Sequence, residues 1–311
     1  MLTKVQLDER LHYVTGSDAA IIAGLSPYKT RAQLWLEKTK RAEQEDISGA
    51  NHIKFGTFME DGVAKWFAAE TGFLVTEPPP GLLIHPDYPW MAGNLDRLVA
   101  DGKPGKAMLE CKTAARSDEW GDGENIIPTL YLMQVAHYCA VGGFDRAYIA
   151  VVFTMTREFR YYVYERNLAL EEKLIKLESE FWHNHVVADV PPVAVSEKDI
   201  LALFPQSTDK PIIATDEIES YVYAYKDFNS QVAGLEEEKR YMRDRIALYM
   251  EDHDVLVSAS GEKLVSWKST KEVERFDTKL LQSEHPDLYT KYLKKGAANR
   301  PFKVTAKGDQ L

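Results

Sequence analysis

Cysteine is scarce in the sequence, and this scarcity excludes several kinds of site. Only Cys111 and Cys139 occur in 311 residues, too few for a disulfide framework or for a four-cysteine zinc or iron–sulfur site. No apolar run approaches the length of about 18 residues that a membrane-spanning helix needs. The first residues, MLTKVQLDERLHYV, lack the basic-then-apolar layout of a secretory signal. We therefore expect a soluble, cytoplasmic protein without membrane contact.

Positive charge is also in short supply. The chain has 38 Lys and Arg against 48 Asp and Glu, a net charge of −10, which opposes indiscriminate adhesion to DNA and would require localised basic contacts. The phosphate-loop pattern Gly-x-x-x-x-Gly-Lys is missing, which argues against an ATP-driven motor. A basic run near the end is either a solvated tail or a contact with the DNA backbone; its members are Lys291, Lys294, Lys295, Arg300, Lys303 and Lys307.

The sequence does contain enough apolar material for a substantial core, at 45% of residues. At about 150 residues per domain, its length corresponds to one large or two ordinary domains. Pro191-Pro192 marks a boundary. We predict an α/β core over residues 1–190 and a C-terminal α+β extension over 191–311, a possible DNA-contact or assembly module.

Periodicity and turn residues predict the secondary structure of both regions. Helices are expected over residues 18–25, 30–40, 55–71, 129–141, 168–187, 196–204 and 216–251. Strands are expected in hairpins within residues 90–115 and 254–268, and over 146–154 and 158–165. The long helix 216–251 is polar overall, yet an apolar set keeps helical spacing along it: Tyr221, Tyr225, Phe228, Val232 and Leu235.

The first hairpin carries the most informative chemistry. Glu110 and Lys112 are two apart on a strand and therefore project from one face, with Cys111 pointing the other way. Asp96 lies on the preceding strand and reaches that face. Two carboxylates and a lysine beside a sheet suit a hard cation such as Mg²⁺, which acidifies a water and stabilises charge on a phosphate.

The alternative, without any catalytic role, is that the same residues form a cross-strand ion pair on a surface strand. The neighbours Met108-Leu109 and Thr113-Ala114-Ala115 do not fit a solvated strand, which favours a functional site. Other candidates are weaker. His183 and His185 project about 200° apart on a helix, so they do not share a metal.

The hairpin resembles the PD-(D/E)XK nuclease signature, with Asp96 followed by Glu110-x-Lys112. Asn94-Leu95 stands where the proline of that signature is usual. Further segments resemble the YqaJ-like viral recombinase group, which includes the lambda-type exonucleases. These segments are TGSDAA (15–20), GLSPYKT (24–30) with LWLEK (34–38), GTFME (56–60) and YLMQV (131–135). The resemblance covers residues 8–165 and implies a restriction-endonuclease-like core, a central mixed sheet flanked by helices.

The resemblance also implies roles for the hairpin residues. Asp96, Glu110 and the main-chain carbonyl of Cys111 would hold metal, and Lys112 would serve the nucleophilic water. Glu60 would reach a metal-bound water or a second metal, its alternative being an ordinary glutamate on a helix surface. The cofactor would be Mg²⁺, with Mn²⁺ as a substitute, as one or two ions.

Four further residues acquire roles in the same way. Gln134 would steady the site or the scissile phosphate, or would only hydrogen-bond to a neighbouring loop. Tyr131 shares its helix face and would contact DNA or only pack in the core. Arg10 and Ser17 match a pocket for a 5′-phosphate, and an arginine fork with a hydroxyl suits that anion. Ser17 would alternatively be an N-cap of the helix at 18–25.

The implied function is a metal-dependent exonuclease that degrades linear double-stranded DNA from its ends. Family likeness implies 5′→3′ polarity, 3′ overhangs for a single-strand annealing recombination protein, and a homo-oligomer, usually a trimeric ring. The alternatives are a structure-selective or nicking endonuclease on the same site and a non-catalytic module that binds DNA ends. The tail RPFKV (300–304) resembles the ends of longer members of the group.

Overall fold

The protein forms two compact units, Met1–Gln206 and Ser207–Leu311. The computed structural model describes residues 8–44, 49–118, 120–121, 126–208, 210–272, 276–294 and 300–305. The division lies later than the Pro191-Pro192 boundary predicted from sequence because α7 (Glu197–Leu203) packs against α3 (Arg31–Lys38). Thr30, the N-cap of α3, donates a hydrogen bond of 2.5 Å to Asp199 of α7.

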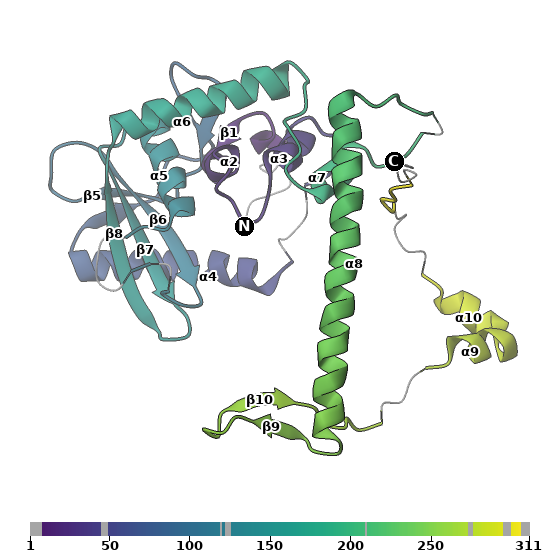
Figure 1. Cartoon of the computed structure of the whole chain (residues 1–311). Coiled ribbons are helices and arrows are strands. Elements are labelled where there is room, and N and C mark those ends of the chain that lie inside the picture. Colours follow the sequence, from purple (N-terminus) through teal and green to yellow (C-terminus); the bar gives the residue numbers. More distant parts are fainter. Residues whose placement is uncertain are drawn as a thin grey trace. The chain divides into compact units, whose positions relative to one another are not determined.

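A five-stranded mixed sheet forms the centre of the first unit (Figure 1). Its order is β2 (Leu74–Thr76), β5 (Arg97–Ala100), β6 (Ala107–Ala114), β7 (Arg146–Phe153) and β8 (Glu158–Glu165). β6 and β7 run parallel, and the other neighbours are antiparallel. All eight residues of β7 are buried, as expected of a central strand covered on both faces.

Helices cover both faces of this sheet (Figure 1). α4 (Asn51–Thr71) packs Val63, Ala64 and Phe67 onto one face, against Tyr148 and its neighbours on β7. α5 (Thr129–Gly142) packs onto the other face, against Ile149 and the β7 residues that alternate with Tyr148. α6 (Leu168–Phe181) lies against α5. The predicted fold class is confirmed: an α/β core with a mixed sheet between helices, as in PD-(D/E)XK proteins.

A smaller sheet joins the start of the chain to this core. β1 (Val14–Thr15) pairs in parallel with β4 (Met91–Gly93), which pairs antiparallel with β3 (Leu83–Ile84). α2 (Gly16–Ile22) follows β1 directly and packs against α5. The first residues of the chain are thereby brought next to the helix that carries Gln134.

The predicted elements occur, with corrections to their bounds. The first helix begins two residues earlier than predicted, after its N-cap Thr15, and ends at Ile22. The second is shorter than predicted, from its N-cap Thr30 to its last residue Lys38. The single helix expected over 168–187 is an α-helix to Phe181 and then a π-helix, Trp182–Val187. The short strands β1, β2 and β4 were not predicted, since two or three residues show no periodicity.

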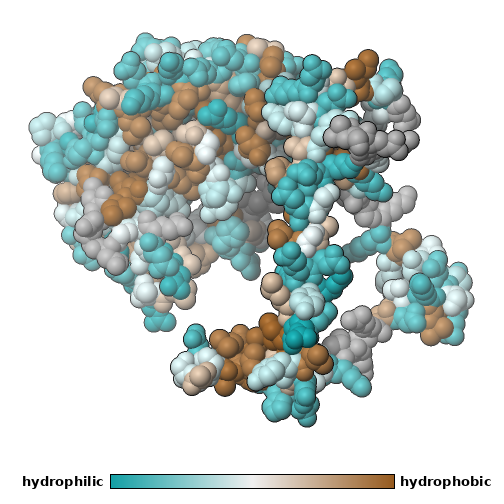
Figure 2. Space-filling model, viewed as in Figure 1, coloured by the Kyte–Doolittle hydropathy of each residue, from teal (hydrophilic) through white to brown (hydrophobic). Residues whose placement is uncertain are grey.

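The second unit consists of one long helix and small elements. α8 (Asp216–Met250) is followed by the hairpin β9 (Val255–Val257) and β10 (Lys263–Ser266), then by α9 (Thr278–Glu284) and α10 (Pro286–Tyr292). Figure 2 shows apolar side chains exposed on the hairpin, where Val257, Leu264 and Trp267 are each more than half exposed. In the basic run of the tail, Lys295 and Lys307 lie outside the described residues. None of the described helices has both the length and the apolar character needed to cross a membrane.

Candidate active site

Asp96, Glu110 and Lys112 meet where the β5–β6 hairpin opens. The two strands pair from Val99↔Ala107 to Arg97↔Leu109, and Asp96 lies just beyond that last pair. The Cys111 N–H donates to Asp96 Oδ2 at 2.8 Å. Lys112 Nζ donates to Glu110 Oε1 at 2.6 Å. The side chains that the strand alternation predicts on one face are therefore together.

The charges of this cluster strongly affect one another. Burial, and next the nearby Glu110 carboxylate, raise the pKa of Asp96 well above its ordinary value. Burial opposes the charged form of Lys112, but the carboxylates of Glu110 and Asp96 outweigh it and raise the pKa of that ammonium. Glu110 is only 2% exposed. A buried and a half-buried carboxylate thus lie beside one lysine, an arrangement that a further cation would stabilise.

The oxygen atoms around Asp96 and Glu110 fit a small hard cation. Glu110 Oε2 is buried and has no hydrogen-bond partner among the described residues, although buried carboxylate oxygens are normally paired. The Cys111 N–H points toward Asp96, and the carbonyl of a strand residue points to the same side as its N–H. The described residues include no group of three or more His, Cys, Asp or Glu side chains arranged for a metal. The donor set here is two carboxylates and a carbonyl, oxygens that suit Mg²⁺.

Glu60 approaches the cluster from α4. Its Oε1 accepts a hydrogen bond of 2.8 Å from Arg97, which also pairs with Glu77 at 3.1 Å. The Glu60 charge contributes to the raised pKa of Asp96, after burial and Glu110. Glu60 is therefore a partly exposed neighbour of the carboxylates, fixed by Arg97. Sequence reasoning missed Arg97, although it directly follows Asp96 in the chain.

Gln134 and Tyr131 face the cluster from α5. Gln134 Nε2 donates to Glu110 Oε1 at 2.7 Å and to the Tyr138 hydroxyl at 3.1 Å, so the predicted alternative of a bond to a neighbouring loop is wrong. The Tyr131 ring centroid lies 5.1 Å from Lys112 Nζ, within cation–π range. The same ring stacks on Trp120. Tyr131 therefore contacts Lys112 as well as the core.

Arg10 and Ser17 form a second polar cluster at the start of α2. Arg10 Nη2 donates to Ser17 Oγ at 2.6 Å and to Thr15 Oγ1 at 3.2 Å. Thr15 is the N-cap, and its N–H and hydroxyl both donate to Asp18 Oδ2 at 2.9 Å. The N-cap interpretation of Ser17 is therefore wrong. Its hydroxyl accepts the bond from Arg10 and lies 3.4 Å from the Thr15 hydroxyl.

Asp18 anchors this cluster in the core. Its carboxylate is paired with Lys38 at 2.7 Å, and both side chains are buried. Burial raises the pKa of Asp18, but the charges of Lys38 and Arg10 outweigh it and lower that pKa. An ionised Asp18 holds Lys38, Thr15 and the start of α2 in fixed positions.

Tyr138 connects the two clusters, and sequence reasoning missed it. Its hydroxyl accepts the bond from Gln134, and its ring fills the space beside two glycines. A Cβ on Gly16 would lie 2.5 Å from the ring, and one on Gly93 would lie 3.0 Å from it, so neither position has room for a side chain. The signal in the sequence is the four-residue spacing from Gln134, which places Tyr138 on the same face of α5.

A buried ion pair fixes α5 in place. The imidazole of His137 contacts Glu178 of α6 through Nδ1 at 2.9 Å and the Ala92 carbonyl through Nε2 at 3.1 Å, and both side chains are fully buried. Burial lowers the pKa of His137, but the Glu178 carboxylate outweighs it and raises that pKa. Through these two contacts His137 joins α5 to α6 and β4.

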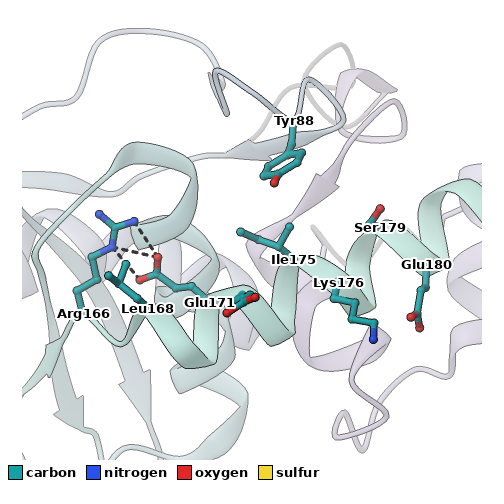
Figure 3. A pocket seen from close by; sticks show the side chains of 9 residues that line it. Tyr88, Arg166, Leu168, Glu171, Ile175, Lys176, Ser179 and Glu180 are labelled. Carbon is teal, nitrogen blue, oxygen red and sulfur yellow. Dashed lines mark hydrogen bonds and ion pairs between the residues drawn. The ribbon is translucent and has the colours of Figure 1, made fainter.

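A surface pocket along α6 is separate from these clusters (Figure 3). Arg166 and Glu171, which line it, pair with each other at 2.9 Å. It is lined by Tyr88, Arg166, Leu168, Glu171, Glu172, Ile175, Lys176, Ser179 and Glu180. None of the predicted site residues is among them, so it is not the predicted active site.

Comparison with known proteins agrees with the class that the fold and site define, a PD-(D/E)XK protein. A model of the YqaJ-like viral recombinase domain matches residues 7–145. The chain is 32% identical over 297 residues to the uncharacterized protein YqaJ of Bacillus subtilis (strain 168), covering 93% of this chain and 90% of that protein. The chain belongs to the YqaJ-like viral recombinase family.

Two solved structures resemble part of the chain. An alkaline exonuclease from Laribacter hongkongensis, in a crystal with dAMP, has a TM-score of 0.49 and 20% identity and covers 60% of this chain and 94% of its own. A phage-related exonuclease from Haemophilus somnus 129PT has a TM-score of 0.42 and 12% identity, with coverages of 57% and 96%.

Proposed function

We propose that the chain is a Mg²⁺-dependent deoxyribonuclease that degrades linear double-stranded DNA from its ends. The observation that carries this proposal is the buried, unpartnered Oε2 of Glu110 beside Asp96 and Lys112. A binding module has no use for a buried carboxylate, Glu110, placed so close to a second that it raises the pKa of Asp96. A hydrolase does, because a cation between them would acidify a water and offset charge on the phosphate.

Each residue of the site would have its own role in binding the cation or in hydrolysis. Asp96, Glu110 and the carbonyl of Cys111 would hold the cation. Lys112 would orient the attacking water and donate to the phosphate as negative charge develops. Gln134, already bonded to Glu110, would keep that carboxylate in position. Glu60, beside the carboxylates, would hold a water or a second ion, and Mn²⁺ would substitute for Mg²⁺.

Exonuclease action is supported by the Arg10–Ser17 cluster. A guanidinium fork and a hydroxyl 2.6 Å apart are suited to a terminal phosphate, which carries more charge than a phosphate within a strand. Tyr138 links this cluster to Gln134. A 5′-phosphate held by Arg10 would direct the first bond of that strand toward the carboxylates, which gives 5′→3′ polarity and 3′ overhangs.

The same resemblance implies partners. We propose that the overhang passes to a single-strand annealing recombination protein, and that the nuclease units assemble as a homo-oligomer, a trimeric ring in the likeness of the family. Basic residues of the tail, such as Lys291 and Arg300, are candidates for contacts with the DNA backbone.

Digestion of end-labelled linear duplex DNA, with a 5′-phosphate on one strand only, tests the proposal. We expect progressive loss of the phosphorylated strand in Mg²⁺, none in EDTA, and no cutting of closed circles. Lys112→Ala should abolish cutting, whereas Lys103→Ala, an exposed lysine in the turn of the same hairpin, should not. Cutting of circles would indicate the endonuclease, and metal-independent DNA binding without cutting would indicate the binding module.

A further inference from the structure

α8 carries an apolar stripe with the repeat of a coiled coil. Two-stranded coiled coils place apolar residues at alternating spacings of three and four, the a and d positions of a heptad. From Ile218 to Tyr249 this spacing is unbroken, and Lys239 is the polar member at one a position. The apolar members are Ile218, Tyr221, Tyr225, Phe228, Val232, Leu235, Met242, Ile246 and Tyr249.

This stripe is exposed throughout. Its members range from 40% exposed at Ile246 to 77% at Tyr249, and Met250 is the buried residue of the helix. Helices in proteins obtain most of their stability from packing an apolar face. The Phe302 ring lies 5.6 Å from that of Tyr225 and touches one end of the stripe. Among the described residues of the second unit, no other helix covers the stretch from Phe228 to Tyr249, which we call the seam.

The charges beside the seam indicate which helix completes it. Glu236 and Glu238 hold the e and g positions of one heptad, and Arg243 and Arg245 hold those of the next. In coiled coils, charges at e and g select partner and orientation. The helix therefore carries an acidic segment followed by a basic one, which is complementary to a copy of itself running in the opposite direction.

The two possible orientations differ at the centre. When two copies run antiparallel with Lys239 opposite Met242, Glu236 faces Arg243 and Glu238 faces Arg245, each pair occurring twice by symmetry. When they run parallel and in register, Lys239 faces its own copy and only Glu238 meets Arg243. The antiparallel pair has more opposite-charge contacts and no like charges at a core position.

We propose that α8 pairs with α8 of a second copy of this chain as an antiparallel two-stranded coiled coil centred between Lys239 and Met242. The proposal is independent of the nuclease activity. If the nuclease units form a trimeric ring, each α8 would pair with α8 of a copy in another ring, since three equivalent helices cannot all pair in twos. The proposal predicts that Val232 of one copy faces Tyr249 of the other. In this register the a and d positions that face each other across the core lie equally far from the centre, on opposite sides of it.

Disulfide trapping in the full-length protein tests the orientation. Val232→Cys and Tyr249→Cys proteins, mixed under mild oxidation, should give a cross-linked pair because facing residues come within disulfide reach. Each variant alone should give none, since equivalent residues of the two copies would lie about 25 Å apart for Val232. Wild-type protein, which contains Cys111 and Cys139, is the control. Cross-linking of Val232→Cys alone would overturn the antiparallel arrangement, and no cross-linking in either case would overturn the pairing.

Charge reversal tests whether the seam holds the copies together. Glu236→Arg with Glu238→Arg should weaken the association at least about tenfold in sedimentation equilibrium, since four favourable pairs become repulsive. Mixing this variant with Arg243→Glu plus Arg245→Glu should restore it. Glu237→Arg with Asp244→Arg, which makes the same change in net charge on the outer face of the helix, is the matched control and should leave it unchanged. An unaltered mass for the seam variant would contradict the proposal and indicate that another part of the chain covers α8.

Discussion

The sheet unit and α8 each carry groups in an unfavourable environment, but of opposite kinds. Around β6, charges are buried: Glu110 is 2% exposed and Asp96 has a strongly raised pKa. Along α8, large apolar side chains are exposed, with Phe228 at 62% and Leu235 at 64%. Burying a charge costs free energy and so does exposing an apolar surface. Each region therefore supports one of the two proposals, a bound cation in the first case and an apolar helix face in the second.

Replacing Glu110 with glutamine should have the largest effect. Glu110→Gln keeps the shape of the side chain but removes the charge that would hold a cation, so we expect the rate of DNA cleavage in Mg²⁺ to fall by about 10³-fold or more. Circular dichroism should show an unchanged fold. Residual activity within tenfold of wild type would mean that the burial of Glu110 serves structure, and the comparison between the two regions would fail.

Replacing Asp96 with asparagine should separate stability from activity. The pKa of Asp96 is raised above the ordinary 3.8, so the ionised group destabilises the fold once the pH exceeds 3.8. Protonated Asp96 favours the folded state. Its contribution to stability is fully present below pH 3.8 and is lost as the pH rises through the raised pKa. Asp96→Asn should therefore be more stable than wild type at pH 7 in EDTA, by about 1.4 kcal/mol for each unit by which the pKa of Asp96 is raised. The variant should also be inactive.

Denaturant unfolding at several pH values measures this effect. The advantage of Asp96→Asn should shrink as the pH is lowered through 3.8, and Mg²⁺ should stabilise wild type more than the variant, because a ligand stabilises the state that binds it. Asp87→Asn, on an exposed turn, is the control. A less stable Asp96→Asn protein at pH 7 would mean that the bond from the Cys111 N–H outweighs the cost of the buried charge.

A smaller effect is expected at Tyr138, where the polar network of the first unit can be cut without removing its packing. Tyr138→Phe keeps the ring between Gly16 and Gly93 but removes the acceptor of Gln134 Nε2. We expect kcat to fall about tenfold, the loss of one hydrogen bond, with an unchanged KM for DNA. Tyr164→Phe is the matched control on β8. Equal loss in both variants would assign Tyr138 a purely structural role.

Local patterns in the sequence predicted the hairpin and its polar face but not the residues that complete the site. Glu110 and Lys112 follow from strand alternation. Asp96 was predicted on the partner strand, but it lies one residue before β5. The four-residue spacing from Gln134 places Tyr138 on the same face of α5, but its packing between Gly16 and Gly93 could not be predicted, because those residues are distant in sequence. The role of Arg97 likewise depends on a contact with α4. Ser17 appeared equivalent to an N-cap because Thr15, two residues earlier, offers the same kind of hydroxyl.

The smallest effect on stability is expected at Leu235 of α8, which we compare with Leu109 of β6. Leu109→Ala, in the core beneath the carboxylates and fully buried, should lower the free energy of unfolding by about 2–5 kcal/mol at every protein concentration. Leu235→Ala removes the same atoms from an exposed position of α8 and should change it by no more than about 0.5 kcal/mol in dilute solution. With rising concentration, thermal melts of wild type should shift upward more than those of Leu235→Ala, because only a paired seam buries that side chain. If the difference in melting temperature between wild type and Leu235→Ala does not change with protein concentration, Leu235 is covered within its own chain. The apolar stripe of α8 would then be part of a core within one copy, as in the sheet unit.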